Sequence, residues 1–138
     1  MEALSEDIFL RKMKIRCCVA YGPQENDRLE KKEAFWKYLD EEVFAARDSG
    51  AGFILQLDGN LWAGDKIISG DPTPQNRNGK LFEEFLQINK LTVVNSLTIC
   101  EGLMKRRRYK DGKLEESIFR FLCCLFLCAA LCQTHGNR

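Results

Sequence analysis

Alternating strand-like and helix-like segments predict an α/β protein of one domain. Apolar residues recur at three- and four-residue steps from about residue 26 to residue 47, which is the spacing of an amphipathic helix. Short apolar runs at 13–20 and 53–57 flank this segment and are typical of strands. Because strands and helices alternate along the chain, we expect a sheet of mixed pairing with helices packed against it.

The remaining elements follow in order. The strand at 13–20 ends at residues 21–23, because glycine and proline interrupt regular structure. The first helix has Asn26 or Asp27 as its candidate N-cap and ends near residues 49–50. The later elements that the sequence predicts are a strand at 53–57, a long loop at 61–79, a helix at 79–89, a strand at 91–95, and two strands at 106–110 and 117–127 that an Asp111-Gly112 turn joins.

Composition narrows the class of protein. The 138 residues carry 21 Lys and Arg against 20 Asp and Glu, and this balance excludes a strongly basic nucleic-acid coat and an acidic tail. Hydrophobic residues make up 45% of the chain and charged residues 30%, as in folded domains. The seven cysteines are odd in number, and four of them lie in the last sixteen residues, unlike a disulfide framework. The acidic N-terminus has no signal-peptide core, so we expect an intracellular protein with reduced thiols.

The segment 121–132 is wholly apolar, and its length decides how it is interpreted. It is much shorter than the roughly 20 residues that a membrane-spanning helix needs. We therefore expect no membrane span and favour a buried strand or a poorly solvated tail. A short membrane-associated protein anchored by this segment is the alternative.

Three polar side chains follow predicted strands, where ligand sites of α/β folds lie. Asp58 and Asn60 come directly after the strand at 53–57 and would point the same way if that strand continued. Asp58 could accept a proton from water, and Asn60 could orient a phosphate or the attacking water. Tyr21 follows the first strand and could donate to a phosphate oxygen. The alternative is structural: a turn at 58–60 and a packed aromatic ring at Tyr21.

Four segments in order resemble one family. Residues 19–26 are similar to a strand-end Tyr-x-Pro motif, 53–64 to a Gly-Asp-x-Asn strand, 91–96 to the strand after it, and 105–119 to the segment that leads to a Ser-x-x-Asp strand. These are motifs of the endonuclease/exonuclease/phosphatase superfamily, which has the DNase I-like fold. The chain most resembles its retrotransposon-type endonuclease branch, over about residues 15–121.

The resemblance implies a function and a cofactor. In the family, the residue at the position of Asp58 helps to activate the attacking water, the one at Asn60 orients water and binds phosphate, and the one at Tyr21 contacts the scissile phosphate. The family metal is usually Mg²⁺, which neutralises phosphate charge and stabilises the leaving oxygen. The implied reaction is hydrolysis of phosphodiester bonds in nucleic acid, with DNA the expected partner and the nucleus a compatible compartment.

A basic run at 105–110 adds candidate substrate-binding residues. Arg106 and Arg107 could lie along a phosphate backbone, and Ser117 stands in the segment that resembles the Ser-x-x-Asp strand. A solvated hairpin face is the alternative.

The resemblance also implies a partial domain. We expect part of a four-layer α/β/β/α sandwich at 13–122, preceded by an extension at 1–12 in which no strand forms, and followed by a divergent, apolar, cysteine-rich tail at 123–138. Half of a sandwich would leave apolar sheet surface uncovered, so we expect marginal stability or self-association.

Several departures from the family pattern predict little or no hydrolysis. Leu57 replaces the Gly before Asp58, and Arg120 replaces the Asp of Ser-x-x-Asp. His135 is not preceded by the family's Ser-Asp, and residues 1–10 do not match the strand that carries the metal-binding Glu. Catalytic groups that act as a unit fail together. The alternative function is therefore a non-catalytic remnant that binds nucleic acid or protein.

Overall fold

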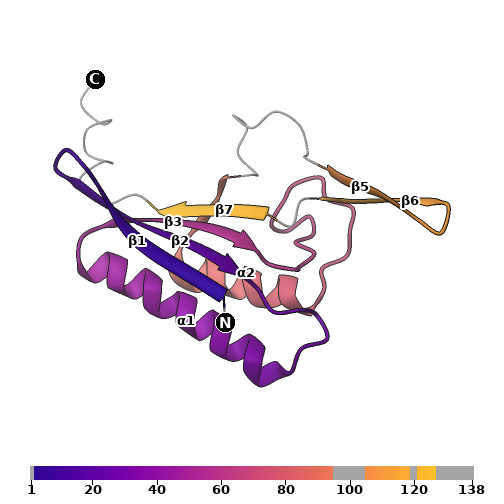
Figure 1. Ribbon diagram of the computed structural model, residues 1–138, viewed down its shortest axis with the longest axis horizontal. Helices are drawn as coiled ribbons and strands as arrows, with labels where there is room; N and C mark the ends of the chain where they lie inside the picture. Colours follow the sequence, from indigo (N-terminus) through magenta and orange to yellow (C-terminus); the bar gives the residue numbers. More distant parts are fainter. Residues whose placement is uncertain (1, 95–104, 119–120, 127–138) are drawn as a thin grey trace.

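The computed structural model describes residues 2–94, 105–118 and 121–126, and these form a five-stranded sheet, two helices and a separate hairpin (Figure 1). The strand order in the sheet is β1-β2-β3-β7-β4. In chain order, the elements are β1 (Glu2–Leu10), β2 (Met13–Tyr21), α1 (Leu29–Asp48), β3 (Gly52–Asp58), α2 (Arg77–Asn89), β4 (Thr92–Val93), β5 (Lys105–Lys110), β6 (Lys113–Ile118) and β7 (Phe121–Phe126).

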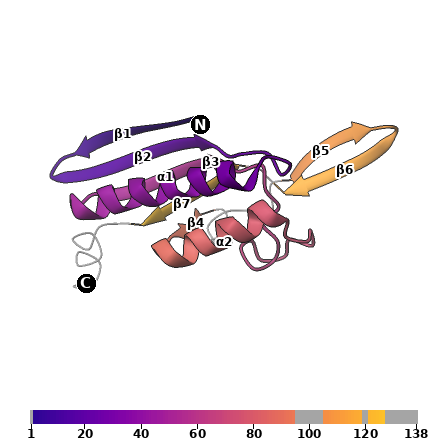
Figure 2. The same ribbon diagram turned by 90° about the horizontal axis from the view of Figure 1, so that it is seen from below.

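The sheet has mixed pairing, as the sequence predicts. Strands β2 and β3 are parallel and are joined by α1, whereas β1 with β2, β3 with β7 and β4 with β7 are antiparallel. Both helices cover the same face of the sheet (Figures 1 and 2). We call this the helix face, and the opposite one the open face. The described residues thus supply one sheet layer and one helix layer of the expected sandwich.

The hydrophobic core lies between the sheet and the two helices. Phe53, Leu55 and Leu57 alternate along β3 and are all buried, as period-two side chains on the helix face should be. Aromatic rings join the helices: the ring centroid of Trp36 in α1 lies 5.9 Å from that of Phe82 in α2. Burying such rings is the main source of stabilisation for this layer.

The open face carries apolar side chains as well. Leu4 of β1 pairs in register with Val19 of β2, and the two are 70% and 42% exposed. Ile8, four pairs further along, is also exposed. Cys18 and Ala20, which alternate with Val19 along β2, are buried on the helix face.

Two expectations about the chain ends need correction. Residues 2–10, expected to form no strand, form β1 and pair along their whole length with β2. The reason is local: Arg11 adopts a left-handed conformation at φ 57° and closes a two-residue hairpin loop. Strand β7 lies between β3 and β4, so the expected tail boundary at residue 123 falls inside a strand of the main sheet.

The helices begin at positions other than those expected. Helix α1 begins at Leu29 with Arg28 at the N-cap position and no side-chain cap, because the carboxylate of Asp27 accepts hydrogen bonds from Gln24 and Lys31 instead. Helix α2 begins at residue 77, two residues earlier than expected, because the Asn76 side chain caps it. Within the described ranges, no helix is long and apolar enough to cross a membrane.

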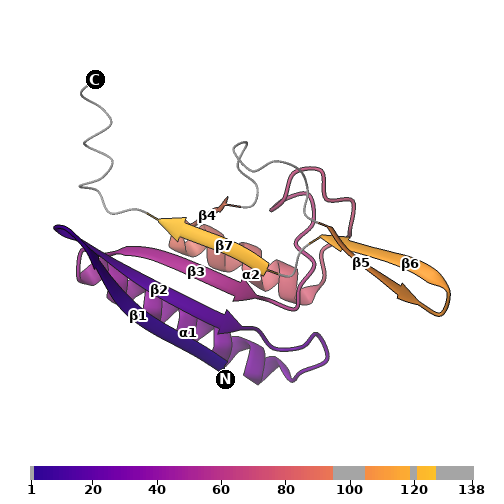
Figure 3. The ribbon, with the colours of Figure 1, turned by 45° about the horizontal axis from the view of Figure 1, so that its top comes forward.

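The second half of the chain divides differently from the expectation. The hairpin turn at Asp111-Gly112 is confirmed, with both residues at positive φ. Its strands, β5 and β6, extend away from the main sheet (Figures 1 and 3). The strand expected at 117–127 is split between β6 and β7, since the chain returns to the main sheet at Phe121. Arg120 and His135 lie outside the described residues.

Candidate functional site

The carboxyl ends of β2 and β3 meet at one edge of the sheet. Because the two strands are parallel, their register pairs the last residue of each, Tyr21 with Asp58. The backbone continues this contact beyond the strands, where the Gly22 N–H donates to the Asp58 carbonyl at 2.6 Å. A Cβ atom on Gly22 would lie 2.9 Å from the Gly59 carbonyl oxygen, so this approach requires glycine.

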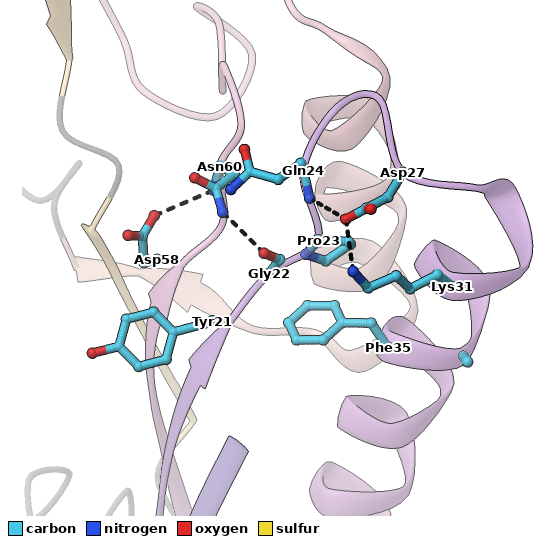
Figure 4. Close-up of a pocket in the computed structure, with 10 residues that line it drawn as sticks. Tyr21, Gly22, Pro23, Gln24, Asp27, Lys31, Phe35, Asp58 and Asn60 are labelled. Carbon is cyan, nitrogen blue, oxygen red and sulfur yellow. Dashed lines mark hydrogen bonds and ion pairs between the residues drawn. The ribbon is translucent and has the colours of Figure 1, made fainter. Parts of the chain in front are cut away.

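Asn60 joins the two strand-end loops. Its backbone N–H donates to Asp58 Oδ1 at 3.3 Å, and its side-chain Nδ2 donates to the Gly22 carbonyl at 2.9 Å (Figure 4). The strand ends at Asp58, and Asn60 adopts a left-handed φ of 46°, which asparagine tolerates. The strand does not continue beyond Asp58, so the condition under which the sequence aligned these two side chains is not met. The Asp58 side chain closes a turn at 58–60 by accepting from the Asn60 backbone N–H, and both side chains line the pocket described next.

A pocket of about 630 Å³ opens at this edge. A volume of this size suits a small polar ligand or one unit of a polymer. Figure 4 shows Tyr21 and Asp58 at one end of the pocket, Asp27 and Lys31 at the other, and Asn60 and Gln24 between them. The residues that line it are Tyr21, Gly22, Pro23, Gln24, Asp27, Lys31, Ala34, Phe35, Asp58 and Asn60. All three side chains that the sequence predicted at the strand ends therefore share one pocket.

The charged pair at the far end of the pocket was missed by the sequence analysis. Lys31 Nζ lies 3.0 Å from Asp27 Oδ2, which also accepts from the Gln24 backbone N–H at 2.7 Å. The hydrogen bond from Lys31, helped by that from Gln24, lowers the pKa of the Asp27 carboxyl. The four-residue spacing of opposite charges at the start of a helix is the signal that could have found this pair.

The residues predicted on the basic hairpin form a separate group. Arg106 of β5 pairs in register with Ser117 of β6, and Arg107 pairs with Glu116. These three residues lie on the hairpin, whereas Tyr21 and Asp58 end β2 and β3 and Asn60 follows β3.

The pocket does not offer a ligand set for Mg²⁺. This ion prefers several oxygen ligands, usually including one or two carboxylates. Asp58 supplies one carboxylate, and the other carboxylate at the pocket, Asp27, is already paired with Lys31. Across the described ranges, no group of three or more His, Cys, Asp or Glu residues could hold a metal ion. The metal that the resemblance implies does not fit these residues.

The fold belongs to a known class. A mixed α/β sheet with helices on one face resembles a DNase I-like endonuclease domain, as the sequence predicted. A solved structure described as the endonuclease domain of TRAS1, a telomere-specific non-LTR retrotransposon, superposes with a TM-score of 0.66 at 15% sequence identity. The match covers 95% of this chain and 52% of that one, so the chain spans about half the length of this neighbour. No protein-family model matches the sequence, and no curated protein matches it.

Proposed function

We propose that this chain is a nuclease-like fragment that binds a phosphodiester of nucleic acid in the pocket at the ends of β2 and β3. The observation that carries this proposal is the register of the parallel pair, which places Tyr21 beside Asp58 while Asn60 bonds to both loops. The fold it shares with an endonuclease domain supports the same conclusion.

Each of the three side chains keeps an unused hydrogen-bonding group for a ligand. The amide of Asn60 has two donors, and the Gly22 carbonyl takes one of them. Asp58 accepts from Asn60 at Oδ1, which leaves Oδ2 to accept a proton from water. Tyr21 is 54% exposed, so its hydroxyl is accessible to a phosphate oxygen. Together they would donate twice to phosphate and accept once from a water molecule.

Hydrolysis by this pocket should be weak or absent. Asp58 can take a proton from water, but it neither neutralises the phosphate nor protonates the leaving oxygen. The described residues supply no metal ligand set to do so. The proposal is therefore phosphodiester binding with little turnover.

The hairpin is the second candidate for nucleic-acid contact. Arg106 pairs in register with Ser117, and Arg107 and Arg108 pair in register with Glu116 and Glu115. The basic run of the sequence at 105–110 is the feature that suggests phosphate contact here.

The test compares binding with cleavage. We expect a labelled DNA duplex to bind the full chain, and Tyr21→Phe, which removes one donated hydrogen bond, to weaken binding about fivefold. Asp58→Asn should strengthen binding, since a carboxylate beside the phosphate is removed. Asp48→Asn, at the exposed far end of α1, is the matched control and should change nothing.

Three results would overturn the proposal. If the wild-type chain and Tyr21→Phe bind DNA with equal affinity, the binding site lies outside the pocket. If Arg106→Ala abolishes DNA binding, the binding site is the hairpin. Plasmid nicking with Mg²⁺ that Asp58→Asn abolishes would show that the chain is an active hydrolase.

A further inference from the structure

The first turn of α2 is bonded to both loops that form the pocket. The side-chain Nδ2 of Asn78 donates to the Pro23 carbonyl at 3.0 Å and to the Asn60 carbonyl at 3.3 Å. Pro23 belongs to the loop after β2, and Asn60 to the loop after β3. One amide group therefore bridges the two strand ends from outside the sheet.

Asn78 is buried and does not itself line the pocket. Its exposed fraction is 1%, and its Oδ1 has no hydrogen-bond partner among the described residues. A buried polar atom without a partner is unfavourable, and an apolar side chain of similar volume would avoid that penalty. The advantage of an amide over an apolar side chain at this position is therefore its two donated hydrogen bonds.

Glu25 fastens the same loop to the same helix. Its Oε1 accepts from the Arg77 backbone N–H and its Oε2 from the Asn78 backbone N–H, each at 3.2 Å. These N–H groups have no partner within the helix, and a carboxylate there is also favoured by the helix dipole. The loop after β2 is therefore held to α2 at two points, through Pro23 and through Glu25.

Asn76 stabilises the start of α2 and contacts the loop after β3 at Trp62, a residue that does not line the pocket. Its Oδ1 accepts from the Gly79 backbone N–H at 2.8 Å and from the Trp62 backbone N–H at 3.0 Å. Capping the helix and bridging the pocket are thus assigned to two asparagines that are two residues apart.

We propose that Asn78 is a positioning residue for the pocket. By holding the carbonyls of Pro23 and Asn60, it fixes the spacing between the Tyr21 and Asn60 side chains before a ligand arrives. Affinity gained in this way comes from preorganisation, since loops that are already ordered lose less freedom on binding. The inference rests on the proposed function, because the ligand that benefits is the phosphodiester.

The experiment compares Asn78→Leu with Asn76→Ala in the full chain. Each loses two hydrogen bonds at the start of α2, so both should lower the melting temperature by several degrees. Only Asn78→Leu should weaken binding of the labelled DNA duplex, by about tenfold. If Asn78→Leu does not fold, Glu25→Gln replaces it in the test, because Glu25 is at an exposed position and its substitution should leave the fold intact. We expect Glu25→Gln to weaken DNA binding by about threefold.

Hydrogen exchange supplies a readout that needs no ligand. Asn78→Leu should speed amide exchange in residues 22–25 and 59–60, whereas Asn76→Ala should leave these residues protected. Unchanged exchange in these loops, or equal loss of DNA affinity in the Asn76 and Asn78 variants, would overturn the inference. Faster exchange in a chain whose wild type binds no DNA would instead retain the positioning role and refute the proposed function.

Discussion

The two faces of the sheet differ in what covers them. On the helix face, Leu39 and Phe53 are completely buried, and the two helices close the layer. On the open face, Leu4, Ile8 and Val19 are exposed within the described residues. A sheet that is apolar on both faces is typical of a domain with a further layer. The described residues therefore close the helix face and leave apolar side chains exposed on the open face.

The largest effect should come from the helix face. Leu39→Ala removes a fully buried side chain and leaves a cavity, so we expect the free energy of unfolding to fall by about 2–5 kcal/mol. Leu4→Ala, on the open face, should change it by less than about 0.5 kcal/mol. Urea unfolding of both variants measures the difference, and equal losses would show that the open face is buried in solution.

Self-association should depend on the open face alone. We expect the wild-type chain to associate as its concentration rises, and the double variant Leu4→Lys, Ile8→Lys to remain monomeric in sedimentation experiments, because the apolar patch is interrupted. Phe44→Lys is the matched control, since Phe44 is 71% exposed on α1. A wild-type chain that is monomeric at all concentrations, or association that only Phe44→Lys abolishes, would contradict this prediction.

Two adjacent thiols report on the two faces of one strand. Cys18 is buried on the helix face, and burial raises the pKa of its thiol above the ordinary value of 9.0. Cys17 is only half-buried. Less thiolate and less access should make alkylation of Cys18 at least about tenfold slower, as measured by peptide mass spectrometry. Equal rates would mean that the helix face opens readily.

The Cys18 thiol also makes the free energy of unfolding depend on pH. Its folded pKa is raised, so the stabilisation it provides is complete below pH 9.0 and declines as the pH rises through the folded pKa.

The smallest effect on stability should come from the pocket at the carboxyl ends of β2 and β3, at the edge of the sheet. Lys31 is exposed and pairs with Asp27, so Lys31→Met should scarcely change stability. Because Lys31 lines the pocket proposed for the phosphodiester, the loss of its charge should reduce the slope of DNA affinity against salt concentration by up to about 0.9 on logarithmic axes. Lys37→Met removes the same charge from an exposed position of α1 outside the pocket and should leave the slope unchanged.

The fold could be predicted from sequence where a local pattern decides it. Helix α1 has a clear apolar period, and strand β3 is a short apolar run before Asp58, so both were predicted within a few residues. Strand β1 was missed because its apolar residues alternate imperfectly, and because no glycine or asparagine marks its hairpin turn at Arg11. The break between β6 and β7 was missed because β7 pairs with β3, which is distant in the sequence.

The candidate site could be predicted only in part. Tyr21, Asp58 and Asn60 each follow a strand, and the rule that ligands bind at strand ends brings them together. Asn78 could not be found in this way, since its partners Pro23 and Asn60 are 55 and 18 residues away. No local pattern marks a side chain whose importance lies in contacts across the chain.

The register that pairs Tyr21 with Asp58 makes the site sensitive to chain length as well as to residue identity. Side chains alternate along a strand, so inserting one residue within β3 would move Asp58 to the helix face or separate it from Tyr21 by one position. An extra residue within the loop at 61–76 would instead leave the pairing of Tyr21 with Asp58 unchanged, because strand register does not fix the length of that loop. An insertion or deletion of one residue in either parallel strand would therefore abolish the pocket while every named side chain was still present.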